Sequence, residues 1–128
     1  MNIRQSAIGT TVLLGADLLW IKLYMGNQYK SQVRRIQGKD MKLNPLFGVL
    51  AYLLMIIGLN LFVLPNIRNG YELEDSIKYG FTFGVILYGV YDFTAGAILS
   101  SWDKRLAVID VLWGGLVYFI AAYSGSSL

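Results

Sequence analysis

Four long apolar segments, separated by three shorter polar ones, account for nearly the whole chain. Each apolar segment has roughly 18 to 23 residues, which is enough for a helix to cross a hydrocarbon core of about 30 Å. The pattern predicts an all-α protein, a four-helix bundle integral to a membrane, forming a single domain over residues 1–128. The predicted spans cover residues 7–25, 46–64, 77–99 and 106–123.

Prolines and polar residues set the predicted boundaries of these spans. Pro45 stands where proline favours the start of a helix, and Pro65 marks the end of the same span. Residues 27–44 predict a polar loop, residues 66–76 a short acidic connection, and residues 100–105 a tight turn. Four crossings place both termini on the same side of the membrane.

Composition supports a membrane location and excludes several kinds of site. Hydrophobic residues make up 55% of the chain and the mean hydropathy is +0.51, more than a soluble core of this size would hide. The sequence contains no cysteine and no histidine. Disulfides, thiolate nucleophiles, Cys/His zinc sites and a Ser-His-Asp triad are therefore excluded. We expect no cofactor, no metal site and no enzyme activity.

The net charge of +3 comes mainly from the first polar connection, which carries Lys30, Arg34, Arg35, Lys39 and Lys42. Basic residues beside a span set its orientation or touch anionic lipid, so we expect the lipid bilayer as a partner and no nucleic acid. Seven Lys/Arg residues lie on the first and third connections, against three on the opposite side. This bias predicts that both termini lie on the non-cytoplasmic side.

Three aspartates interrupt the predicted spans, although a charge at the centre of a bilayer helix costs roughly 2.5–3.5 kcal/mol on insertion scales. These are Asp17, Asp92 and Asp110, and Lys22 is the only cation placed similarly. Counting helical rise puts all four in the cytoplasmic half, within a layer about 8 Å thick. Tyr88 lies one turn before Asp92. We therefore predict one polar intramembrane cluster of Asp17, Lys22, Tyr88, Asp92 and Asp110.

Two interpretations of this cluster stay open. A buried carboxyl group can hold helices together by hydrogen bonds to a tyrosine or a backbone carbonyl. Alternatively, it can form a working site, as aspartates do in pumps and transporters. Lys22 is expected to pair with Asp92 or Asp110, or to reach the cytoplasmic surface. Small residues beside polar ones also predict close helix packing at Gly80, Gly84, Gly89, Gly96 and Gly114.

A longer pattern runs through the first, third and fourth spans. It comprises Asp17-Leu18-Leu19-Trp20, Tyr91-Asp92-Phe93-Thr94, Trp102, and Asp110-Val111-Leu112-Trp113-Gly114. These residues resemble the small four-span membrane proteins known as domain of unknown function 2177, found in bacteria and in some large DNA viruses. The resemblance covers most of the chain and implies an architecture and candidate residues, but no activity. Ala95 departs from the family's usual Asn, and Asp103 from a common Pro.

Three functions follow from these features, in a definite order. We expect first a structural or accessory subunit of a larger membrane assembly, in a cell membrane or an inner virion membrane, bound to other subunits or to itself. A proton, cation or small-solute carrier using the aspartates comes second. An enzyme comes last: Tyr91-Asp92 resembles half of an intramembrane aspartyl protease, but Asp110 lacks the preceding Gly-x-Gly.

Overall fold

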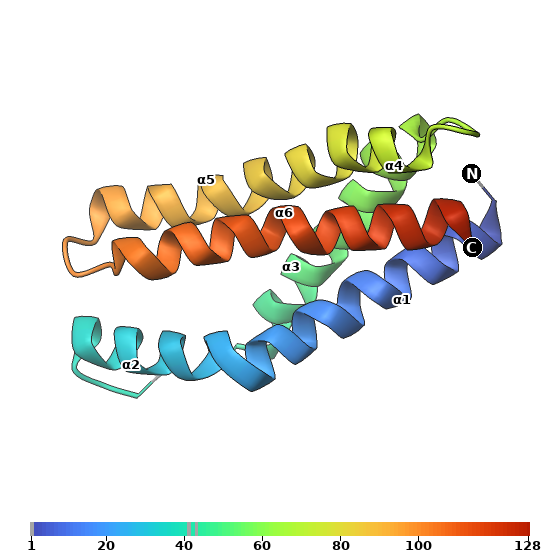
Figure 1. Ribbon diagram of the computed structural model, residues 1–128. Helices are drawn as coiled ribbons and strands as arrows, with labels where there is room; N and C mark the ends of the chain where they lie inside the picture. Colours follow the sequence, from blue (N-terminus) through green and yellow to red (C-terminus); the bar gives the residue numbers. More distant parts are fainter. Residues whose placement is uncertain (1, 41, 43) are drawn as a thin grey trace.

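The computed structural model describes residues 2–40, 42 and 44–128, and all regular structure in these ranges is helical (Figure 1). Four continuous helices are long and apolar enough to cross a membrane, which confirms the predicted all-helical, four-span fold. The shortest has 22 residues, or about 33 Å of helix against a hydrocarbon core of about 30 Å. The four helices run Ile3–Gln37, Pro45–Asn66, Glu72–Ile98 and Lys104–Ser127.

Three of these helices contain a π-helical turn, a rare element that appears mostly as a single turn within an α-helix. The first consists of α1 (Ile3–Trp20), the π turn η1 (Ile21–Met25) and α2 (Gly26–Gln37). The second consists of α3 (Pro45–Gly58), the π turn η2 (Leu59–Val63) and the 3-10 turn η3 (Leu64–Asn66). The third consists of α4 (Glu72–Asp75), the π turn η4 (Ser76–Phe81) and α5 (Thr82–Ile98). The fourth is α6 (Lys104–Ser127).

The polar loop expected over residues 27–44 is wrong for most of its length, because α2 continues the first helix to Gln37. The segment has no proline, and its Gln, Lys and Arg residues are good helix formers, so a helix already nucleated in the apolar span propagates onward. It ends at Gly38, whose φ of 72° lies in the left-handed region that favours glycine.

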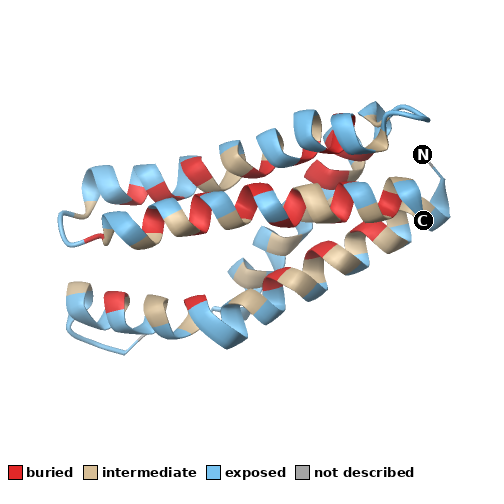
Figure 2. Cartoon of the chain, viewed as in Figure 1, coloured by how far each residue is buried: buried red, intermediate tan, exposed pale blue. Residues whose placement is uncertain are grey.

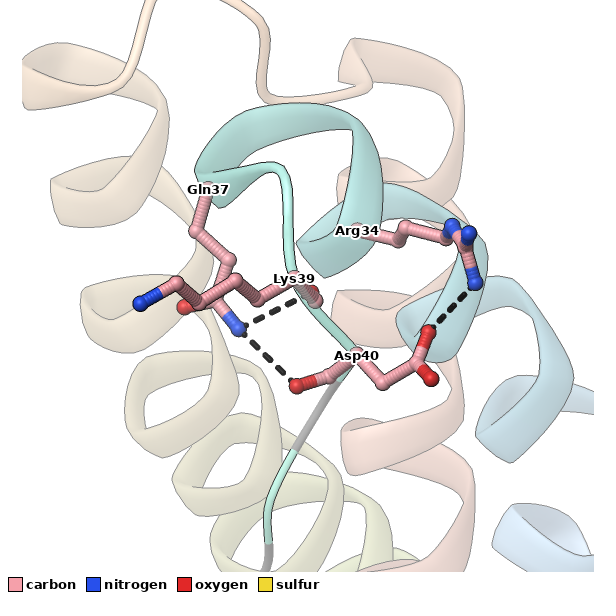
Figure 3. Close-up of polar contacts among 4 residues, drawn as sticks. All are labelled: Arg34, Gln37, Lys39 and Asp40. Atoms are coloured by element: carbon pink, nitrogen blue, oxygen red, sulfur yellow. Dashed lines mark hydrogen bonds and ion pairs between the residues drawn. The ribbon is translucent and has the colours of Figure 1, made fainter.

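The turn after α2 is fixed by side chains from the helix end (Figure 3). The amide of Gln37 donates to the carbonyl groups of Lys39 and Asp40, at 3.0 and 3.1 Å. Arg34 forms an ion pair with Asp40 at 2.6 Å, but both side chains are largely exposed. An exposed pair of this kind contributes about 0–1 kcal/mol, so the turn is shaped mainly by Gly38 and Gln37.

The second and fourth long helices start at residues with side-chain caps. Asn44 caps α3 by accepting from the backbone N–H of Phe47 at 3.3 Å, with Pro45 in the first turn. Asp103 caps α6 by accepting from the backbone N–H of Arg105 at 2.9 Å. These caps satisfy backbone donors that have no partner inside the helix.

Helix α6 lies at the centre of the bundle, between α5 and α1, while α3 crosses obliquely behind it (Figure 1). Half of the apolar stretch of α6 is buried, against 17% in each of the other three helices. Buried positions recur along α6, whereas the outer faces are exposed (Figure 2). The two termini lie at the same end of the bundle, as an even number of spans requires.

Small residues bring the helices close to α6. A Cβ atom added to Gly84 would collide with the carbonyl group of Gly114, and one added to Gly80 would lie 2.9 Å from the carbonyl oxygen of Tyr118. Of the other predicted packing positions, Gly89 is buried at ordinary contact distance, whereas Gly96 is exposed. Gly80, Gly84 and Gly114 are therefore the three that set the close approach of the third and fourth helices.

Candidate intramembrane aspartate sites

Asp17 lies at a point where all four long helices meet. Its Oδ2 accepts from the hydroxyl of Tyr52 on α3 at 2.9 Å. Its Oδ1 accepts from the hydroxyl of Tyr88 on α5 at 2.8 Å and from the indole N–H of Trp113 on α6 at 3.1 Å. The aspartate itself belongs to α1 and is 5% exposed. One carboxyl group thus receives a donor from each of the other three helices.

Hydrogen bonds and aromatic packing hold the carboxyl group of Asp17 in place. An ionised carboxylate offers acceptor sites only, so three donors match its chemistry. Trp113 also stacks on Trp20 of α1, with ring centroids 4.7 Å apart and planes 11° from parallel. The carboxyl group therefore acts as an interhelical connector, the first of the two roles considered for the aspartates.

Asp92 and Asp110 form a second, separate site. Asp92 lies on α5 and Asp110 on α6, and their carboxyl groups are neighbours. The residues are 1% and 4% exposed. The hydroxyl of Tyr29 on α2 lies beside Asp110. Within the described ranges neither aspartate forms an ion pair, so two acidic groups face each other without a cation.

Several buried polar atoms have no hydrogen-bond partner among the described residues. They include Oδ2 of Asp92, the indole nitrogen of Trp102 and Nε2 of Gln32. The indole of Trp102 lies near Asp92, but no hydrogen bond joins the two among the described residues. Gln32 is 1% exposed, and its Oε1 accepts from the backbone N–H of Asp103. An unpaired buried polar group costs free energy, about 1–3 kcal/mol.

Ala95 and Asp103 lie close to this second site. Ala95 packs against Trp102 in a small apolar cluster, one turn beyond Asp92. Asp103 supplies the backbone N–H that Gln32 accepts, a donor that proline lacks. These contacts hold α2 against the turn between α5 and α6.

The predicted single cluster is therefore divided in the structure. Tyr88 belongs to the Asp17 site and lies one helical turn from Asp92, so it stands between the two sites. Lys22 lies in the π turn η1 on an exposed face. No ion pair joins Lys22 to an aspartate in the described part of the chain, so it belongs to neither site.

A third polar contact lies nearer the termini. The amide of Asn60 donates to the hydroxyl of Thr10 at 3.0 Å, and the hydroxyl of Ser6 donates to Asn60 Oδ1 at 2.6 Å. These residues line an open groove between the first and second long helices, with a volume of about 640 Å³. The amide of Asn60 is thus satisfied by the first helix, and this contact joins the two helices.

Several residues of these sites could not be selected from the sequence. Tyr52 is a single tyrosine in an apolar span, and only the fold reveals that it reaches Asp17. Tyr29 and Gln32 lie in α2, in the segment that the sequence predicted to be a loop. Extending the helix to Gln37 would have placed both at i, i+3, on one face.

The fold and the buried polar sites define an integral membrane protein with four spanning helices. No group of three or more acidic side chains in the described residues is arranged to hold a metal ion. The chain belongs to the domain-of-unknown-function family 2177 (DUF2177), described as "Predicted membrane protein", whose model matches residues 3–127. This confirms the resemblance seen in the sequence. The comparisons found no match among curated proteins or solved structures.

Proposed function

We propose that the protein is a non-catalytic accessory subunit that joins a larger membrane assembly through the outer face of α1. A row of small residues supports this proposal: Ala7, Thr11 and Gly15 follow one another at one per turn, and all three are exposed. A Cβ atom at Gly15 would have nothing within 4 Å. The buried residues of α1, among them Leu13 and Asp17, lie on the other side of the helix.

Small residues matter on this face because lipid tails are as apolar as leucine and provide no hydrophobic driving force between helices. Helices in a bilayer associate where small side chains allow backbones to approach. The same chain uses this device internally, where Gly9 of α1 lies against Gly125 of α6. An unused row of the same kind on the outside of α1 favours a helix of another subunit, or of a second copy.

The position of Lys22 also supports an interface on this face of the first helix. It lies seven residues, or about two turns, after Gly15 and is exposed. A lysine near the end of a span can reach the membrane surface with its ammonium group. On a subunit interface it would also offer an ion pair to a carboxylate of the partner.

Cross-linking through a single cysteine tests the proposed face directly, because the native sequence has no cysteine. Thr11→Cys places the thiol in the small-residue row, and Leu54→Cys places it on an exposed part of α3. We expect a covalent adduct with another chain at Thr11→Cys and none at Leu54→Cys, when each thiol carries a short photo-activated cross-linker in native membranes. Equal yields at the two positions would contradict the proposal.

A size series at Gly15 provides a second test. Gly15→Ala keeps the face small, whereas Gly15→Leu fills it without touching the rest of the bundle. We expect Gly15→Leu to fold normally, as judged by detergent-resistant helicity, and to lose its co-purifying chains. Gly15→Ala should retain them.

We also propose that both termini lie on the non-cytoplasmic side, as the distribution of Lys and Arg favours. The variants Ser127→Cys and Lys39→Cys place a thiol at opposite ends of the bundle. A membrane-impermeant thiol reagent applied to intact cells should label Ser127→Cys and leave Lys39→Cys unlabelled. The reverse pattern would invert the proposed orientation.

A carrier of protons, cations or small solutes is the second candidate, and the buried Asp92–Asp110 pair favours it. Buried ionisable groups that pair with no opposite charge are typical of proton and ion pathways. Flux into liposomes that contain the purified protein separates this function from the subunit role. Flux that is lost in Asp92→Asn would support a carrier, and absence of flux in the wild type would exclude it.

A further inference from the structure

Helix α5 carries an open groove on its outer surface, in the half of the helix that leads to the α5–α6 turn. The groove has a volume of about 320 Å³ and is lined by Val90, Tyr91, Thr94, Ala95 and Ile98. All of these residues except Ala95 are exposed. The helical rise from Val90 to Ile98 is about 12 Å, close to the roughly 15 Å depth of one leaflet. In a bilayer, the groove is therefore suited to one acyl chain of a lipid.

The groove ends beside the α5–α6 turn, and the side chain of Trp102 links the two. Its indole ring lies edge-on to the ring of Tyr91, with centroids 5.9 Å apart, and it packs against Ala95. The backbone N–H of Trp102 donates to the carbonyl group of Leu99 at 3.0 Å, which makes the turn compact. Helix α6 starts two residues later, at Lys104. The start of α6 therefore lies close to the end of the groove.

A further cation reaches this turn from α2. The guanidinium group of Arg35 donates to the carbonyl group of Ser101 at 3.4 Å, although the two residues are 66 positions apart in the sequence. Lys104 and Arg105 follow Ser101 in the chain, and all three basic residues are exposed. The fold thus gathers three cations around one turn, at the end of the bundle opposite the termini.

These three cations form no ion pair within the part of the chain that the structure describes. Asp103, in the same turn, instead uses its carboxylate to cap α6. At the other end of the bundle, by contrast, Arg68 donates twice to Asp75, at 2.9 and 3.1 Å. Lys104 and Arg105 also lie in the first turn of α6, where the helix dipole favours an anion over a cation. A bound anion at this turn would therefore offset the repulsion among the three cations.

We propose that this end of α5 binds one anionic glycerophospholipid, with an acyl chain in the groove and the phosphate group held by Arg35 and Lys104. A guanidinium group can bind two phosphate oxygens at once, and a lysine near the membrane surface attracts an anionic headgroup. Arg105 adds to the positive potential at the same turn. The site is built from α2, α5 and the start of α6, so it does not depend on the subunit role proposed for the outer face of α1.

Native mass spectrometry of the whole protein in detergent micelles tests this proposal. Phosphatidylglycerol is the anionic probe, and phosphatidylcholine with the same acyl chains is the zwitterionic control. We expect the wild type to retain one phosphatidylglycerol in preference to phosphatidylcholine. A basic residue near the membrane surface contributes about 1 kcal/mol, or about fivefold in affinity, so Arg35→Gln/Lys104→Gln should bind phosphatidylglycerol roughly 25-fold more weakly.

A matched double variant separates a defined site from general attraction to a basic surface. Lys30→Gln/Lys39→Gln removes the same charge from the same end of the bundle, and Lys30 lies about 140° from Arg35 around the axis of α2. We expect this variant to bind phosphatidylglycerol as the wild type does. Equal losses in the two double variants, or equal affinity of the wild type for the two lipids, would overturn the proposal.

Thr94→Trp tests the groove, because the larger side chain fills it from an exposed position. Phe93→Trp is its control, since Phe93 is a neighbouring exposed residue of α5 that does not line the groove. We expect Thr94→Trp to keep its helicity and to lose most of its bound phosphatidylglycerol, whereas Phe93→Trp should keep both. Unchanged binding in Thr94→Trp, or displacement of the lipid by glycerol phosphate, which has no acyl chain, would overturn the proposal.

Discussion

Replacement of Asp17 by alanine is the perturbation with the clearest expected size. The change removes the acceptor for three donors on three different helices: the hydroxyl groups of Tyr52 and Tyr88 and the indole N–H of Trp113. It also leaves a space at the point where the four helices meet. The loss should therefore appear as a lower stability of the whole bundle and not of one helix.

The magnitude follows from the hydrogen bonds that are lost. Interhelical hydrogen bonds in membrane proteins contribute about 0.6 kcal/mol on average and up to about 1.7 kcal/mol. Three such bonds amount to about 2–5 kcal/mol, a large part of the roughly 5–15 kcal/mol that stabilises a typical domain. Asp17→Asn retains one acceptor oxygen and should lose about half as much.

Reversible unfolding in mixed micelles with increasing denaturing detergent, followed by circular dichroism, measures this difference. Tyr52→Phe and Tyr88→Phe each remove one donor and should each destabilise by about 0.6–1.7 kcal/mol. In the Asp17→Ala background either tyrosine change should have almost no further effect, because its partner is already absent. Wild-type stability in Asp17→Ala, or full additivity with Tyr88→Phe, would refute the assigned role.

Two further changes probe the packing around α6. Gly84→Ala adds a Cβ atom that collides with the carbonyl group of Gly114, so we expect the free energy of unfolding to fall by about 1–3 kcal/mol or more. Gly15→Ala adds a Cβ atom that meets open space, so it should be nearly neutral in the same unfolding assay. Tyr118→Phe removes a fully buried hydroxyl that donates to the carbonyl oxygen of Met55 at 2.7 Å. It should destabilise by about 0.6–1.7 kcal/mol, and a stability equal to that of the wild type would argue against this bond.

The span architecture could be predicted because the bilayer imposes it. A helix that crosses a membrane needs roughly twenty apolar residues, and the four segments are long enough and separated by polar residues. Pro45 and Pro65 indicated the two ends of the second span, because proline favours the first turn of a helix and disrupts its interior. In contrast, the predicted end of the first helix was wrong, because the same polar composition is compatible with a loop and with an exposed helix. Only Gly38 indicates where this helix ends.

The buried sites were predictable in part. The cost of a charge in lipid singled out Asp17, Asp92 and Asp110, and the structure buries all three. Depth along the helices placed them in one layer but could not decide which faced which, because that depends on helix rotation and tilt. Tyr52, which lies in no recognisable motif, completes the Asp17 site through the oblique crossing of α3.

Lys22 illustrates the same limit of sequence patterns. A lone cation among three aspartates suggested either an ion pair with Asp92 or Asp110 or a lysine that reaches the cytoplasmic surface, and in the structure Lys22 is exposed. Asp17 and Lys22 are five residues apart, which places them about 140° apart around the helix axis. Once Asp17 faces the bundle interior, this angle carries Lys22 toward the surface.

The proposed subunit role is tested most directly by the native mass of the protein after extraction from its source membrane with a mild detergent. We predict that the wild-type chain migrates in a particle that contains other polypeptides or further copies of itself, and that Gly15→Leu releases it. A wild-type particle with the mass of one 14.3 kDa chain plus its detergent would contradict the proposed subunit role.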